Sequence, residues 1–472
     1  MNLGSLTLGV LNGMSYGLLA VGLVLVYRSN KFLNLAHGQL GALSAVLLAK
    51  FVVDLGMSYW LAMPLAIAVG VLTGVGVERL FVARLARRTS SAVSQLLLTL
   101  GISQLLLALL FVDVLQPDPI KLAAQHYPVP FHASFTFGGV VLGSQHLLIA
   151  VLCPIVVAGL ALFLRYSLMG KKIRAAASNA DAARLCGISP GRISATTWGI
   201  AGGLSAMSAI LHAPSLGAFD GSGLGPDQLF VALGAAAFGA FVSIPRALAG
   251  GLTIGVVEAV VVHLTSNAGT ARLVVFVLVL GVIFAQGRAI ASVFASRGAG
   301  VDDRPPVRVP AAVRDRFLVR WQSPLCRTVV LLALVLLPLL PGLTTEGRRF
   351  QLVLILIYAV VAVSLTMLIG WGGQLSLGHL AVVGLGAFVT ARAAPHGWSV
   401  PALLLLAGAI GAGSLVVVGL PALRVRGLTL AVTTLGFALV ANEFLFRRQW
   451  LTGTDTPQVD VSGVRVLRGI GP

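Results

Sequence analysis

The chain is divided into apolar runs of about 20 residues, the length that an α-helix needs to cross the hydrocarbon core of a bilayer. In a bilayer each backbone polar group must be bonded within its own segment, so runs of this kind predict helices. Hydrophobic residues make up 57% of the chain and charged residues 10%, which excludes an ordinary soluble protein. We place the runs at 7–27, 33–54, 59–77, 92–115, 146–164, 195–212, 228–244, 247–265 and 271–286, then at 328–342, 351–370, 375–392, 399–420 and 427–446.

Basic residues gather in a few segments between these runs. They cluster in Arg79–Arg88, Lys171–Arg192 and Arg288–Arg327, and the net charge is +18. The positive-inside rule puts these segments in the cytoplasm, where they also meet anionic membrane lipid, and it turns the N-terminus outward. Few aromatic residues are interleaved with the bases, so we expect no nucleic-acid partner. The first run is a full span without a cleavage site, and we expect it to be retained.

Residues 287–327 contain Pro, Ala, Gly and many Arg but no apolar run, which predicts a basic cytoplasmic linker. It separates a first membrane domain, 1–286, from a second, 328–472. The second domain partly repeats the first: Tyr16 precedes His37 by 21 residues (37 − 16), and Tyr358 precedes His379 by 21 (379 − 358). LLLTLGI at 96–102 also resembles VTTLGF at 432–437. The pattern predicts an all-α polytopic membrane protein with two homologous helical bundles in parallel orientation.

One inter-span segment, 168–192, looks soluble. Within it, Arg174–Cys186 predicts a short amphipathic helix that ends at Gly187, with small residues on one face: Ala175, Ala176, Ala182 and Ala183. Such a helix suits docking into a groove of a cytoplasmic partner. The alternative is an ordinary basic loop that obeys the positive-inside rule, and charge does not separate the two.

Two stretches of the chain resemble different subunits of one transporter family. LNGMSYGLLAVGLVLVYRSNKFLNLAHGQLGAL resembles the start of the first permease subunit of branched-chain amino acid ABC importers. YAVVAVSLTMLIGWGGQLSLGHLAVVGLGAF, then GLPALRVRGLTLAVTTLGFA and LTGTDTP, resemble the second permease subunit. The chain is thus similar to a fusion of the two, with the second half truncated, and we expect it to continue past Pro472.

The resemblance implies a permease of the bacterial inner membrane with helical bundles of the ABC importer type. Its implied partners are two cytoplasmic ATP-binding subunits, an extracytoplasmic binding protein and a small amino-acid substrate. Asp181, Ala182, Ala183 and Gly187 resemble the family's Glu-Ala-Ala…Gly motif, which with Arg174 marks the loop that couples the permease to its ATPase. Ser178 and Asn179 depart from the family's acids, which leaves the docking orientation open. Urea or short-chain amide importers are the nearest rivals.

The sequence contains no recognisable catalytic, cofactor or metal motif. Gly170-Lys171 lacks a Walker A pattern, because Arg165 replaces its first Gly and Lys172 replaces its Ser or Thr. We therefore expect a permease that is not an enzyme and relies on ATP hydrolysis by separate subunits.

A few polar residues inside the runs are candidates for the pathway or gate. Glu258 is the one carboxylate well inside a span; we favour a packing role for it over the transport role it would have in a rival ion-coupled carrier. His37 and His379, beside Asn34 and Ser376, occupy matching places in the two halves. They either line the pathway or tie a broken helix to its neighbour, and we favour the second role. In keeping with this, 33–54 is either a full span or a broken, re-entrant element. Small-residue pairs such as Gly70/Gly74, Gly199/Gly203 and Gly251/Gly255 predict close helix packing.

Overall fold

The computed structural model describes residues 3–88, 92–125, 127–131, 133–215, 224–286, 346–372, 374–423 and 429–452, with Leu325, Thr328 and Leu332 as isolated positions. The first half contains α1 (Leu3–Asn30), α2 (His37–Val53), α3 (Tyr59–Val77), the π-helical η1 (Glu78–Val82), α4 (Ala83–Ala86), α5 (Ala92–Leu110), α6 (Pro119–Gln125), β1 (Ser134–Phe137), β2 (Val140–Gly143), α7 (Ser144–Tyr166), α8 (Leu168–Ser178), α9 (Ala180–Leu185), α10 (Pro190–His212), the 3₁₀ turn η2 (Ala213–Ser215), α11 (Leu224–Phe238), α12 (Ile244–Thr265) and α13 (Ala268–Ala285). The second half contains α17 (Glu346–Gly370), α18 (His379–Ala393), the 3₁₀ turn η5 (Ala394–His396), α19 (Val400–Leu423), α20 (Thr429–Val440), the π-helical η6 (Ala441–Leu445) and α21 (Gln449–Thr452).

The predicted all-α polytopic membrane fold is confirmed. Seven described helices are long and apolar enough to cross a membrane: Leu3–Asn30, Tyr59–Ala86, Ser144–Tyr166, Ile244–Thr265, Ala268–Ala285, Phe350–Gly370 and Val400–Gly419. Four shorter apolar helices accompany them, and the helix in the predicted run 33–54 starts only at His37. The run 33–54 is therefore helical only from His37 onward, after a short non-helical stretch, and its helix is continuous to Val53. The predicted linker 287–327 and span 328–342 lie outside the described residues, apart from the three isolated positions.

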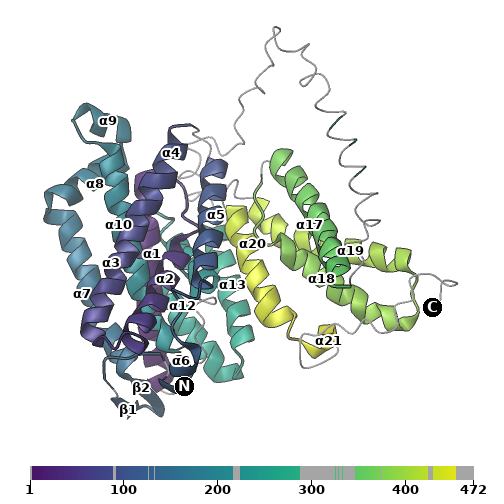
Figure 1. Ribbon diagram of the computed structural model, residues 1–472, viewed down its shortest axis with the longest axis horizontal. Helices are drawn as coiled ribbons and strands as arrows, with labels where there is room; N and C mark the ends of the chain where they lie inside the picture. Colours follow the sequence, from purple (N-terminus) through teal and green to yellow (C-terminus); the bar gives the residue numbers. More distant parts are fainter. Residues whose placement is uncertain are drawn as a thin grey trace, which may run out of the picture.

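The two ends of the bundle differ in charge and structure. Helices α4, α8 and α9 lie at one end, whereas the β1–β2 hairpin, α6 and the N-terminus lie at the other (Figure 1). The hairpin is antiparallel, with Ser134 paired to Gly143 and Phe137 to Val140. We call the first end, which carries the segments Arg79–Arg88 and Lys171–Arg192, the basic end, and the other the hairpin end.

Helix α1 forms the centre of the first half because glycines bring its backbone against α12. A Cβ atom added at Gly255 would lie 2.4 Å from the Gly13 nitrogen and 2.4 Å from the Gly9 oxygen, and one at Gly251 would lie 2.4 Å from the Gly17 nitrogen. The other predicted glycine pairs act similarly between α3 and α10, where a Cβ at Gly74 would lie 2.3 Å from the Trp198 oxygen. These small residues replace side-chain contacts with direct contact between backbones.

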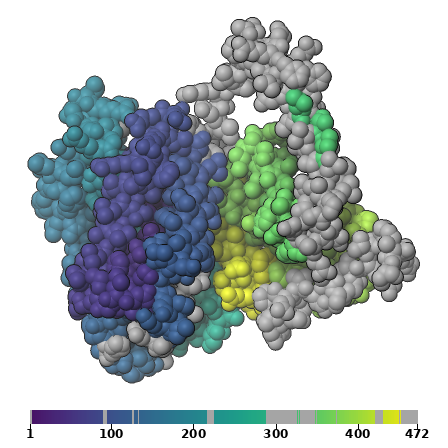
Figure 2. All heavy atoms as spheres, in the orientation of Figure 1, coloured from purple at the N-terminus to yellow at the C-terminus, as the bar shows by residue number. Residues whose placement is uncertain are grey.

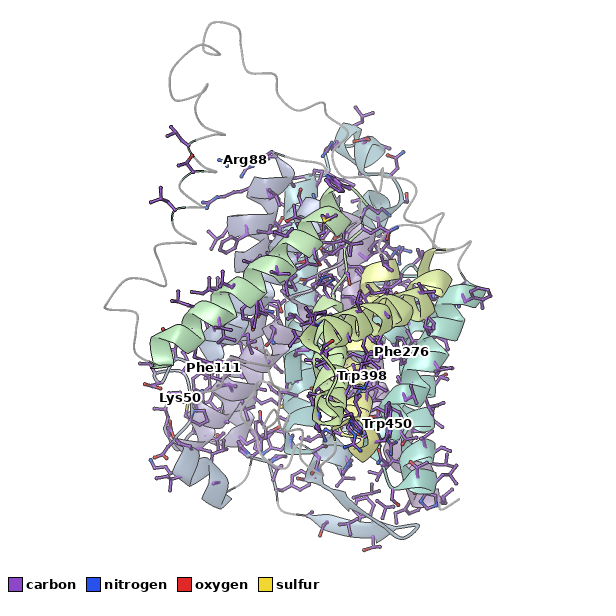
Figure 3. All side chains as sticks on the ribbon, turned by 90° about the vertical axis from the view of Figure 1, so that its right-hand side faces the viewer. Lys50, Arg88, Phe111, Phe276, Trp398 and Trp450 are labelled. Atoms are coloured by element: carbon purple, nitrogen blue, oxygen red, sulfur yellow. The ribbon has the colours of Figure 1, made fainter. Side chains whose placement is uncertain are left out.

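The second half packs on the first mainly through α20, which lies beside α13 and α11 (Figures 1 and 2). Gly436 makes room for two aromatic rings, since a Cβ there would lie 2.5 Å from Phe230 Cε2 and 2.7 Å from Phe276 Cδ2. Phe276, on α13, lies close to the helices of the second half in Figure 3. One hydrophobic core includes residues such as Phe230, Val275, Ala431 and Val440, and therefore runs through both halves.

Candidate functional site

The candidate residues from the sequence fall into three places. Asp181, Ala182, Ala183 and Gly187 lie at the basic end, in and just after α9. Asn34, His37, Ser376 and His379 lie at the breaks that precede α2 and α18. Glu258 lies on α12, apart from both of these groups. The structure therefore does not bring the three groups together into one site.

The segment 168–192 differs from the single helix expected over Arg174–Cys186. The backbone breaks at Asn179, where φ is −150° and ψ is 105°, so that α8 ends and α9 begins there. The Asn179 side chain explains the break, because its Oδ1 accepts hydrogen bonds from the backbone N–H groups of Asp181 at 3.1 Å and Ala182 at 3.0 Å. An asparagine that caps a helix start in this way ends the preceding helix and begins a second one.

The expected end of this segment at Gly187 is confirmed. Gly187 has φ of +77°, a left-handed conformation that glycine adopts at little cost. Its N–H bonds the Arg184 oxygen at 3.0 Å, and the N–H of Ile188 bonds the Ala183 oxygen at 3.0 Å. Bonding of this kind satisfies the last free carbonyls of α9 and turns the chain back toward α10.

The four alanines do not form one common face, because of the break at Asn179. Ala176 and Ala183 are buried and pack with Ile173 and Ile193, whereas Ala175 and Ala182 are exposed. Leu185 is 91% exposed at the tip of α9, beside the exposed Asp181–Arg184 ion pair of 3.1 Å. We call Asp181, Ala182, Leu185 and Gly187 the α9 tip.

Arg174 contributes to the base of this segment. Its Nη2 donates to the Arg165 oxygen at 3.2 Å, close to the end of α7. A pocket of about 440 Å³ lies behind the α9 tip and is lined by residues that include Arg184, Ser194, Asn30, Glu78 and Arg87. The end of α1, the π-helical turn η1 and the start of α10 thus meet beside α9.

The two helix breaks are built alike, at equivalent positions offset by 342 residues (379 − 37). In the first half the Leu35 N–H donates to Thr99 Oγ1 at 3.2 Å; in the second the Leu377 N–H donates to Thr434 Oγ1 at 2.9 Å. Thr99 and Thr434 lie within the two similar segments LLLTLGI and VTTLGF. The broken backbone in each half is therefore held by a threonine from the same repeated motif.

The two histidines also anchor equivalent breaks, but to different partners. His37 Nε2 lies 3.0 Å from the Leu19 oxygen, and His379 Nε2 contacts Ser364 Oγ. The position equivalent to Ser364 in the first half is Gly22 (364 − 342), and a Cβ there would lie 2.9 Å from His37 Nε2. The ring of His37 thus occupies the volume that a serine side chain takes in the second half.

Asn34 and Ser376 lie in the same breaks and are both buried. Asn34 Oδ1 accepts from the Ala36 N–H at 3.0 Å, which shapes the turn before α2. Asn34 Nδ2, Ser376 Oγ and the Nδ1 atoms of both histidines have no partner within the described residues. Each break therefore has some polar atoms that hold the turn by hydrogen bonds and others that have no hydrogen-bond partner within the described residues.

Glu258 is not alone, in contrast to what its isolation in the sequence suggests. Tyr16 on α1 hydrogen-bonds its carboxyl group, and Arg272 on α13 and Asp227 on α11 interact with it electrostatically. Arg272 Nη2 lies 3.9 Å from Asp227 Oδ2. Sequence reasoning missed both Arg272 and Asp227. Arg272 could have been noticed as a basic residue within the predicted run 271–286. Asp227 lies just before the predicted run 228–244, whereas α11 begins at Leu224 and includes it.

Most of this chain matches one protein family. Residues 5–284 and 349–468 match the family described as branched-chain amino acid transport system, permease component. The high-affinity branched-chain amino acid transport system permease protein BraD of Pseudomonas aeruginosa is 31% identical over 264 residues, covering 53% of this chain and 83% of that protein. The permease protein LivH of the same kind of system in Escherichia coli K12 is 29% identical over 269 residues, with the same coverage of 53% and 83%.

A second kind of relative matches a shorter stretch. The permease protein LivM of the Escherichia coli K12 branched-chain amino acid system is 31% identical over 121 residues, which cover 25% of this chain and 28% of LivM. No solved structure matches the chain.

Proposed function

The chain belongs to the family of branched-chain amino acid transport permease components, and from this premise we propose that it carries branched-chain amino acids inward through an ATP-driven importer. The protein is a multi-pass membrane protein of the bacterial inner membrane. The observation that carries the proposal is the family match in two segments, 5–284 and 349–468, whose helices share one hydrophobic core.

We propose further that the chain joins two permease subunits, with 1–286 and 328–472 as the two domains and 287–327 as their linker. Relatives of both kinds, LivH and LivM, support this division. The matching threonine bonds at Leu35 and Leu377 support an origin of the halves by duplication. The contact between α20 and α13 then corresponds to an interface between subunits in importers that keep them separate.

The α9 tip is proposed to seat in a groove of a cytoplasmic ATP-binding subunit, with a second such subunit engaging the complex. An exposed leucine at a charged tip has no packing role within the described fold, and it suits insertion into a partner. The positive-inside rule places the basic end in the cytoplasm, as this docking requires. The hairpin end then faces an extracytoplasmic binding protein, which delivers the substrate. ATP would be hydrolysed by the separate subunits.

The proposal is tested by reconstituting the full chain in proteoliposomes with its candidate ATP-binding subunits and binding protein. We expect uptake of labelled leucine that requires ATP and is lost in Gly187→Asp, because the substitution strains the left-handed residue and places a charge at the docking tip. The matched control is Gly191→Asp, which places the same charge at the exposed start of α10. A glycine within a span, such as Gly159, is not suitable as a control.

The same experiment separates the rival functions. Urea uptake without leucine uptake would identify a urea or amide importer. The other outcome is leucine uptake that is driven by an ion gradient, independent of ATP and unchanged in Gly187→Asp. That result would contradict the importer and favour an ion-coupled carrier that uses Glu258.

A further inference from the structure

Polar atoms without partners gather toward the hairpin end, between five helices of the first half. They are Asn12 Oδ1 on α1, His212 Nδ1 on α10, Gln228 Nε2 on α11, Glu258 Oε2 on α12 and Arg272 Nη1 on α13, each unpaired among the residues that the structure describes. With Tyr16 these residues form what we call the polar layer. Buried polar groups in proteins are nearly always hydrogen-bonded, so a cluster of unpaired ones requires an explanation.

Contacts between neighbouring helices place these residues near one another. Helices α1 and α12 pack antiparallel, with Gly9 against Ala259 and Gly17 against Leu248. Tyr16 on α1 interacts with Glu258 on α12 across this close contact. The rings of Tyr16 and His212 lie 5.8 Å apart between centroids. Arg272 interacts electrostatically with Tyr16, Glu258 and Asp227 at once.

Gln228 joins the polar layer through α10. Its Oε1 lies 3.4 Å from Ser208 Oγ, and Ser208 lies one turn before His212 on the same face of α10. Asn12 lies one turn before Tyr16 on the same face of α1. The unpaired atoms thus belong to side chains that converge from five helices.

Four of these five unpaired atoms are of two chemical kinds, whereas the role of His212 Nδ1 depends on the tautomer. Glu258 Oε2 and Asn12 Oδ1 are acceptors, whereas Arg272 Nη1 and Gln228 Nε2 are donors. A free amino acid at neutral pH presents the complementary pair, since its α-ammonium group donates and its α-carboxylate accepts. A group of donors alone would suit an anion, and a group of acceptors alone would suit a cation.

Two buried aromatic rings lie next to the polar layer. Phe276 follows Arg272 by one turn of α13, and Phe230 follows Asp227 by three residues of α11. Both rings lie against Gly436 of the second half, so they mark the interface between the halves. An amino acid held by its charged groups at the polar layer would direct an aliphatic side chain toward these rings.

Two side chains at the edge of the polar layer are partly exposed. The Asp227 side chain is 34% exposed and that of Arg272 is 18% exposed. A pocket of about 230 Å³, lined by residues that include Asn267, Gly269, Glu443 and Arg447, lies one turn of α13 from Arg272. Glu443 comes from the second half and also acts electrostatically on Arg272, so both halves contribute to this pocket beside the polar layer.

We propose that the polar layer binds the charged groups of the amino acid during translocation, with Glu258 and Asn12 receiving the α-ammonium group and Arg272 and Gln228 donating to the α-carboxylate. This inference rests on the proposed function and adds to it a site within the membrane domain itself. The permease then recognises the ammonium and carboxylate groups of a free amino acid, and this selectivity adds to that of the binding protein.

The test is direct binding to the purified full chain in lipid nanodiscs, without a binding protein. Saturation-transfer difference NMR detects ligands of millimolar Kd, and the probe is L-leucine. We expect valine to displace leucine, whereas 3-methylbutylamine, which lacks the carboxylate, and 4-methylpentanoate, which lacks the ammonium group, do not. In Glu258→Gln and Arg272→Gln leucine binding should weaken about tenfold or more, because each loses a charge-assisted bond.

Asp54→Asn is the matched control, because it removes a carboxylate near the hairpin end that bonds Lys50 and the Asp118 N–H instead. It should leave leucine binding unchanged. The inference is overturned if either analogue displaces leucine as well as valine does, if the two variants bind normally, or if the wild-type chain shows no leucine signal at millimolar concentration. The analogue comparison uses the wild-type chain and decides the matter even if a variant fails to fold. ATP-dependent leucine uptake by the whole complex, measured separately, shows whether the proposed function survives such a result.

Discussion

At the scale of single residues, this membrane domain depends on positions where a side chain is missing. Gly255 and Gly13 place two helix backbones in direct contact, and no side chain other than hydrogen fits between them. The sequence identified the pair Gly251/Gly255 but could not name α1 as its partner, because small-residue spacing specifies a close approach and not the helix that makes it.

Gly255→Ala should therefore destabilise the protein by about 1–3 kcal/mol, the usual cost of an overpacked site. The measurement is thermal unfolding in detergent, followed by size-exclusion chromatography. Gly159→Ala on α7, where an added Cβ meets nothing within 4 Å, should change stability by less than about 1 kcal/mol. Equal effects of the two substitutions would contradict the close α1–α12 packing.

The threonines at the two helix breaks support a second prediction at this scale. Thr434→Val removes the acceptor of the Leu377 N–H and should lower stability by about 1 kcal/mol, and Thr99→Val should do the same through Leu35. Thr366→Val serves as the control, because the Thr366 hydroxyl donates to the Ala362 oxygen of its own helix. Thermal unfolding again reports the result. If Thr99→Val and Thr434→Val match the control, the threonines do not hold the breaks.

At the scale of elements, the break between α8 and α9 at Asn179 was not predicted from the sequence, although the end of the segment at Gly187 was. The Gly187 position correctly predicted a sharp end to this segment, but the single helix expected over Arg174–Cys186 is two helices, α8 and α9. The break was missed because Ala175–Ala183 reads as continuous helix, although Asn179 followed by Asp181 is a typical helix start. The apolar spans and the repeat were predictable because both leave periodic signals, whereas the partners of Glu258 come from separate helices and leave none.

The break at Asn179 supports a prediction about the coupling between the permease and its ATP-binding subunits. Asn179→Ala removes the cap of α9, which is worth about 1 kcal/mol, and should lower the ATPase activity stimulated by the permease several-fold because the α9 tip loses its fixed orientation. Ser189→Ala is the matched control, since Ser189 precedes α10 without a side-chain capping bond. ATP hydrolysis by the reconstituted complex and thermal unfolding are measured together. Normal stimulation in Asn179→Ala would show that the orientation of α9 does not matter for coupling.

At the scale of the whole molecule, the two halves form one body through α20. Gly436 admits Phe230 and Phe276, and Gly269 approaches the Glu443 oxygen so closely that an added Cβ would lie 2.4 Å away. Arg448 of the second half also donates to Thr270 Oγ1 of the first at 3.4 Å. The repeat predicted that the halves are alike, but it could not predict which helices join them, since that contact is made by unlike surfaces.

The interface can be tested with a protease site inserted in the segment 287–327 of the full chain. After cleavage the two halves should still elute together, and Gly436→Leu should cause them to separate because the leucine displaces both aromatic rings. Gly408→Leu on α19, where an added Cβ meets nothing within 4 Å, should leave them together. Separation of the unmodified halves after cleavage would mean that α20 does not hold the molecule together.

The exchange of Gly22 for Ser364 at the two histidine anchors has a consequence for how such a gene can change. The two halves share a pattern, yet each histidine has its own partner: a backbone carbonyl at Leu19 for His37 and a hydroxyl at Ser364 for His379. Copying the helix of one half into the other by recombination would place a serine against His37 or remove the partner of His379. On the proposed origin by duplication, the two copies of this helix would no longer be interchangeable at the histidine anchors.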